Sequence, residues 1–75
     1  MTTIRYDVEY RDPDDEDDGW LYYDNGGDSL STAERRARGA ARQHSQDARV
    51  LADGAEVARF APDRALKSGV RRVRS

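Results

Sequence analysis

The most constraining feature of the sequence is a strict alternation near its N-terminus. From Thr3 to Arg11, apolar side chains stand at the even positions and polar ones at the odd positions, the apolar set being Ile4, Tyr6, Val8 and Tyr10. A period of two places the apolar set on one face of a β-strand, and β-branched and aromatic side chains suit a pleated surface. The chain must therefore contain a strand that is covered on one side.

A second strand is expected over Trp20 to Asp24, because turn-forming residues bound it on both sides. Asp12 to Gly19 combine a proline, a glycine and mutually repelling carboxylates, which favours a hairpin loop, and Asn25 to Asp28 form the next turn. The two strands should pair as an antiparallel hairpin.

A helix is expected to start at Ser31, because Ser31-Thr32-Ala33-Glu34 matches a capping box. On a helical wheel one face carries Ala33, Ala37, Ala40, Ala41, His44 and Ala48, and the opposite face carries Arg35, Arg38 and Arg42. A face of small residues needs bulky partners on a sheet, for which we expect Tyr6, Tyr10 and Trp20 or Tyr22.

A second hairpin follows the helix. Asp53-Gly54 is typical of a two-residue type I′ turn, and it should join Arg49–Ala52 to Ala55–Phe60 with Val50 opposite Val57 and Ala52 opposite Ala55. Pro62 should end the last strand. Asp63 to Ser68 could then form one helical turn closed by Gly69, and residues 70–75 should form a basic tail, mobile unless a partner or the sheet edge takes it up.

These elements predict an α+β fold. The expected order is β-β-α-β-β, with an antiparallel sheet packed on one Ala-faced helix and a flexible basic C-terminal tail. Residues 1–61 should form the domain, and residues 62–75 the short helical turn and the tail.

The composition limits the class of protein. The 75 residues include no cysteine, which removes disulfides, thiolate zinc sites and thiol nucleophiles and fits a reducing compartment, so we expect a cytoplasmic protein. No apolar run approaches the roughly 18 residues that span a bilayer, and the N-terminus lacks the pattern of a signal peptide, so no membrane partner is expected. A core this small would gain from self-association, which leaves a homodimer open.

Charge is divided unevenly along the chain. Residues 1–28 contain ten acids and two arginines, a charge of -8, whereas residues 29–75 contain five acids and eleven basic residues, a charge of +6. Either half could be an electrostatic binding surface. The candidate acidic face, with one aromatic neighbour, comprises Asp12, Asp14, Asp15, Glu16, Asp17, Asp18, Asp24, Asp28 and Tyr23. The candidate basic surface comprises Arg35, Arg38, Arg42, Arg71, Arg72 and Arg74.

The acidic loop has three interpretations. It can be a solvated loop that aids solubility, or a mimic of a phosphate backbone that occupies a basic site on another protein. It can also be laid on a calcium loop with Asp14, Glu16 and Asp18 as ligands, but Asn25 stands where that loop needs a bidentate Glu. No metal site is therefore predicted.

No catalytic or cofactor site is expected. His44 is the only histidine and suits a packing role, no serine or acid has a recognisable spacing to it, and Gly26-Gly27 is not followed by the lysine of a phosphate-binding loop.

We expect a non-enzymatic module whose acidic surface docks on a basic site of a larger protein, such as a nucleic-acid-binding site. In size and charge the chain resembles the small acidic proteins that phages and mobile elements make to block host or defence machinery, such as anti-CRISPR inhibitors, and this resemblance implies an inhibitor. Two alternatives remain: a nucleic-acid-binding protein that uses the Arg-rich helix and tail, and a self-assembling structural subunit in which unlike halves meet.

Overall fold

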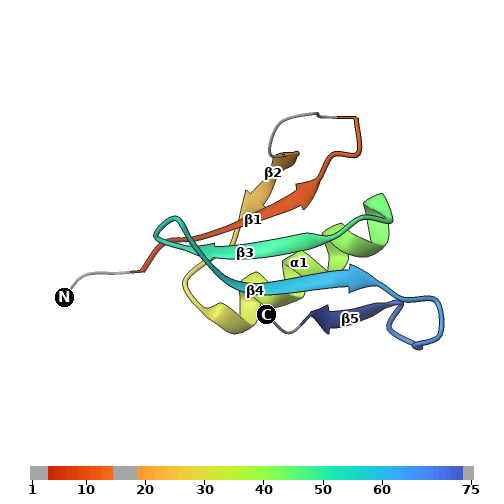
Figure 1. Ribbon diagram of the computed structural model, residues 1–75. Helices are drawn as coiled ribbons and strands as arrows, with labels where there is room; N and C mark the ends of the chain where they lie inside the picture. The colour runs from red at the N-terminus through yellow and green to blue at the C-terminus, as the bar shows by residue number, and fades with distance from the viewer. Residues whose placement is uncertain (1–3, 15–18, 74–75) are drawn as a thin grey trace.

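The computed structural model describes residues 4–14 and 19–73, which form a five-stranded antiparallel sheet with a helix on one face (Figure 1). The elements in chain order are β1 (Tyr6–Arg11), β2 (Trp20–Asn25), α1 (Leu30–His44), β3 (Ala48–Ala52), β4 (Ala55–Pro62) and β5 (Val70–Val73). The strands lie side by side in the order β2-β1-β3-β4-β5. The predicted α+β fold and its β-β-α-β-β order are confirmed, and β5 is added at the edge.

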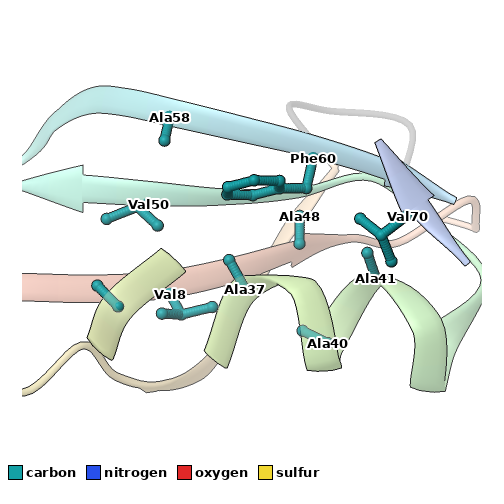
Figure 2. Packing of buried hydrophobic residues seen from close by; sticks show 10 residues of the cluster. Val8, Ala37, Ala40, Ala41, Ala48, Val50, Ala58, Phe60 and Val70 are labelled. Atoms are coloured by element: carbon teal, nitrogen blue, oxygen red, sulfur yellow. The ribbon is translucent and has the colours of Figure 1, made fainter. Parts of the chain in front are cut away.

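The helix contributes only alanines to the centre of the core. Ala33, Ala37, Ala40 and Ala41 are fully buried, as the helical wheel predicted, but Ala48, predicted on the same helical face, lies in β3 because α1 ends at His44. Facing them are a phenylalanine, three valines and two further alanines of the sheet: Val8, Ala48, Val50, Ala58, Phe60 and Val70 (Figure 2). Because alanine keeps the helix close to the sheet, one large ring is enough to fill the space between them.

The large ring at the centre of the core was not among the aromatic rings predicted to fill this space. Phe60 of β4 is fully buried. Tyr6 and Tyr10 pack against the core as expected, and Tyr23 joins them. The expectation that Trp20 or Tyr22 would fill this space is wrong, since neither belongs to the cluster of buried and packed side chains.

The helix also starts earlier than the capping box predicted. Ser29 is the N-cap, with extended backbone, and its hydroxyl accepts a hydrogen bond from the amide of Thr32 at 3.2 Å. The third helical residue is thus Thr32, whose hydroxyl accepts from that of Ser29 at 2.9 Å. Glu34 lies too far into the helix to complete a capping box, and it pairs with Arg72 instead.

A bulge decides which side chains of β4 reach the core. Asp53 and Gly54 both have positive φ (49° and 89°), as a type I′ turn requires, and Ala52 pairs with Ala55 as predicted. The register then shifts, so that Val50 pairs with Ala58 and not with Val57. Without this shift every later residue of β4 would point to the opposite face, and Phe60 would leave the core.

The C-terminal segment is part of the sheet. Val70–Val73 pairs with β4 from Pro62↔Val70 to Arg59↔Val73, so the sheet edge takes up these residues and the expected flexible tail is wrong for them. The β4–β5 connection contains turns and no helix, and Gly69 closes it with φ +74°. Arg74 lies outside the described residues.

Two glycines should respond oppositely to alanine. A Cβ on Gly26 would lie 2.8 Å from the Cβ of Ala33 and closer still to that of Tyr6, whereas a Cβ on Gly39 would meet nothing within 4 Å. Gly26→Ala should lower the free energy of unfolding by about 1–3 kcal/mol through overpacking, and Gly39→Ala should raise it by about 0.5–1 kcal/mol through helix propensity. Urea unfolding followed by far-UV circular dichroism measures both. If both variants changed the free energy of unfolding in the same direction and by the same amount, α1 could move away from β1 without cost.

Candidate functional site

The strand order determines where the acidic and basic segments of the chain lie in the sheet. The acidic N-terminal residues supply β1 and β2, and the basic C-terminal half supplies β4 and β5 at the other edge. Because β1 pairs with β3, the β1–β2 hairpin forms one edge of the sheet and β4 with β5 forms the other (Figure 1).

Four acids of the predicted acidic face are among the described residues, and they lie around the two ends of β2: Asp12, Asp14, Asp24 and Asp28. We call these four residues together with β2 the acidic end. Asp12 is paired with Gly19 through the backbone and its carboxylate accepts from the amide of Asp14 at 2.9 Å, so both lie beside the start of β2. Asp24 lies near the end of β2, where it pairs with Val8, and Asp28 follows in an exposed turn. The predicted residues Asp15, Glu16, Asp17 and Asp18 lie outside the described residues.

Between these carboxylates, β2 presents large side chains to solvent. Tyr22 is 59% exposed and Leu21 is 38% exposed. Tyr23, the tyrosine predicted to contact a partner, lies differently: its ring makes edge contacts with Tyr10 and His44, and its hydroxyl donates to Gln43 at 2.9 Å. The strand is bulged here, because the β1–β2 register skips Tyr23. The aromatic side chain available for contact is therefore Tyr22.

The face of the sheet away from the helix carries an ion-pair network that the sequence analysis did not identify. The Arg49 guanidinium donates to Glu9 at 2.8 Å and lies 3.7 Å from Glu56, which also pairs with Arg59 at 2.7 Å. The indole ring of Trp20 covers both cations, at 4.2 Å from the Cζ atom of Arg49 and 5.1 Å from that of Arg59. The sequence did indicate which residues of β1 and β3 point away from the helix. It could not indicate that Arg59 lies beside Arg49, because that alignment depends on the bulge in β4.

The basic residues divide into paired and unpaired groups. Arg35, Arg38 and Arg42 are exposed on α1, as predicted. Arg72 is held by Glu34 at 2.7 Å, and Arg71 lies 3.9 Å from Asp63. Within residues 4–14 and 19–73, the three helical arginines therefore make no ion pair, whereas the two arginines of β5 each lie beside a carboxylate.

His44 lies in an aromatic cluster at the end of α1. Its ring stacks on that of Tyr10 with centroids 3.8 Å apart and planes nearly parallel. Among residues 4–14 and 19–73, no group of three or more histidine or acidic side chains could hold a metal ion. Within the same ranges, no helix is long and apolar enough to cross a membrane.

Comparison with known proteins does not place the chain in a family. No protein-family model, no curated protein and no solved structure matches it. The function is therefore inferred from the surfaces themselves.

Removing the central cation of the open face should destabilise the fold. Arg49→Leu leaves half-buried Glu9 without its partner and removes the support of the Trp20 ring. The free energy of unfolding should fall by about 1–3 kcal/mol, between the values for exposed and buried pairs. The exposed Arg11, which makes no ion pair with the described residues, provides the control: Arg11→Leu should change it by less than about 0.5 kcal/mol. Similar losses in both variants, measured by urea unfolding, would contradict a structural role for the network.

Proposed function

We propose that the protein is a non-enzymatic binding module whose acidic end docks on a basic surface of a larger protein. The observation that carries the proposal is an edge strand, β2, that exposes Tyr22 between two groups of carboxylates. Protein interfaces are built in this way, with an aromatic anchor at the centre and polar or charged residues around it.

The charge of this surface selects the partner. Asp12 and Asp14 lie beside the start of β2, and Asp24 and Asp28 lie near its end and in the turn after it. A phosphate backbone would therefore be repelled and a basic protein attracted. The free backbone groups of an edge strand add a second mode of recognition, because a partner strand can pair with them.

The basic surface that fits such a charge pattern is a nucleic-acid-binding site of the partner. The module would then occupy that site and act as an inhibitor, as phage-encoded proteins of this size and charge do. The absence of cysteine fits a complex that forms in the reducing cytoplasm.

Photo-crosslinking tests where the partner docks. A benzoylphenylalanine placed at Tyr22, in cells of the source organism, should capture one basic protein, and the same group placed at Arg35 on the opposite side of the molecule should not. Capture from both positions, or of a second copy of this chain from Tyr22, would contradict the proposal.

Affinity for the purified captured protein tests which residues bind it. Asp24→Asn with Asp28→Asn should weaken binding at least about tenfold, and Tyr22→Ala about thirtyfold, as expected for interface charges and an aromatic anchor. The matched control is Asp53→Asn with Asp63→Asn, which removes two charges elsewhere and retains the side-chain oxygens that accept from the Arg5 and Ala65 amides. Isothermal titration calorimetry measures each affinity. Equal losses in the acidic-end and control variants would indicate non-specific attraction and overturn the proposal.

A further inference from the structure

The side of the molecule opposite the acidic end carries four arginines that are in no ion pair among the described residues. Three of them belong to α1 and one to the β4–β5 connection, and we call this set the basic flank: Arg35, Arg38, Arg42 and Arg64. All four are exposed. Their charges are therefore not neutralised by any side chain that the structure describes.

The neighbouring acids are already engaged. Glu34 accepts from Arg72 at 2.7 Å. The carboxylate of Asp63 accepts from the Ala65 amide at 2.9 Å through one oxygen and lies 3.9 Å from Arg71 through the other. The basic flank is thus positive even though two carboxylates lie beside it.

Packing orients two of the four arginines. The guanidinium of Arg38 lies 5.0 Å from the centre of the Phe60 ring, so this side chain leans from α1 toward β4. The aliphatic part of Arg42 lies beside Gly69, where an added Cβ would be 3.5 Å from its Cγ and Cδ. The helix and the β4–β5 connection therefore present their cations on one continuous surface.

A cleft of about 420 Å³ separates the end of α1 from the β4–β5 connection. It is lined by Arg42, Ser45, Pro62, Asp63, Arg64 and Gly69. The lining includes two guanidinium groups, a hydroxyl and the carboxylate of Asp63, which the Ala65 amide and Arg71 engage, but no aromatic or large aliphatic side chain. Such a cleft suits a charged, hydrated group better than the apolar anchor of a protein partner.

The spacing of the cations suits a polymer with regularly repeated negative charge. Arg35, Arg38 and Arg42 extend over about 10 Å along the helix axis at a rise of about 1.5 Å per residue, and Arg64 continues the set across the cleft. Arginine donates a planar pair of hydrogen bonds that matches the oxygens of a phosphate. Of the polyanions with this repeat, the nucleic-acid backbone also tolerates a site without apolar pockets, because phosphate contacts alone supply non-specific binding.

We propose that the basic flank binds the phosphodiester backbone of a nucleic acid, with Arg42 and Arg64 each contacting a phosphate at the cleft and Arg35 and Arg38 each contacting a neighbouring one. No base-reading contact is part of this site. The proposal concerns a different surface from the acidic end and does not depend on the partner proposed for it.

Fluorescence anisotropy of a labelled random-sequence duplex, titrated with the full chain at several salt concentrations, tests the site. Four phosphate contacts predict a slope of about -3.6 in log affinity against log salt, so binding should weaken about 150-fold between about 50 and 200 mM. Arg38→Gln with Arg42→Gln should make the slope less steep by about 1.8. A labelled single strand should bind with a smaller slope, near 0.7 per phosphate in place of 0.9.

Two further variants separate the site from general effects of charge and folding. Arg35→Gln with Arg64→Gln removes two cations without touching Phe60 and should reduce the slope equally, whereas Arg5→Gln with Arg11→Gln removes two cations elsewhere and should leave it unchanged. The proposal is overturned if the duplex does not bind at the lowest salt, or if the Arg5 and Arg11 variant loses as much as the others. It is also overturned if polyglutamate at equal charge displaces the duplex as well as unlabelled duplex does, since the flank would then recognise acidic protein.

Discussion

The close approach of an alanine-faced helix to the sheet is the constraint on which the rest of the structure depends. Ala33, Ala37, Ala40 and Ala41 are fully buried, and the ring of Phe60 is the largest fully buried side chain opposite them. So small a core leaves little tolerance, because close-packed interiors respond to changes of a single methyl group. The tight fit at Gly26, between β1 and the first turn of α1, is a direct consequence.

A thin core also explains why side chains outside it are so extensively paired. The network of Glu9, Arg49, Glu56 and Arg59 under Trp20 covers the sheet face opposite α1. A domain of this length buries only about 60–65% of its unfolded surface, so half-buried ion pairs and a stacked indole contribute a larger share of its stability than they would in a larger protein. Both register shifts serve this arrangement: the one at Val57 turns Arg59 to the open face, and the one at Tyr23 turns that ring toward the helix.

What the sequence predicted well was local and periodic. The alternation from Tyr6 to Tyr10, the alanine face of α1 and the Asp53-Gly54 turn each depend on neighbouring residues alone, and all three are confirmed. Ile4, predicted on the covered face of the same strand, precedes β1 and is 47% exposed, so the prediction is wrong at that end. The errors arose where a distant partner decides the outcome. Val70–Val73 becomes a strand only because β4 has a free edge, and Val57 leaves the expected register because Phe60 must reach the core. For the site, the exposure of the helical arginines followed from periodicity, but the choice of Tyr22 over Tyr23 required the bulge.

The same strand order keeps the two charged surfaces independent. Four strand spacings of about 4.8 Å place β2 and β5 about 19 Å apart, whereas the Debye length at physiological salt is about 8 Å. The charges at the two edges of the sheet are therefore largely screened from each other, although the total charge is only -2. Glu9 and Arg49, on the adjacent strands β1 and β3, form a pair in which the acidic and basic halves do meet. A chain whose charges were mixed along its length would lose both surfaces to internal pairing. The β1–β2 hairpin with its loop is predominantly acidic, whereas the cations of α1 and of the β4–β5 connection lie toward the other edge of the sheet. Each region therefore retains a field that a partner of opposite charge can detect, and the two partners would not compete for the same side of the molecule.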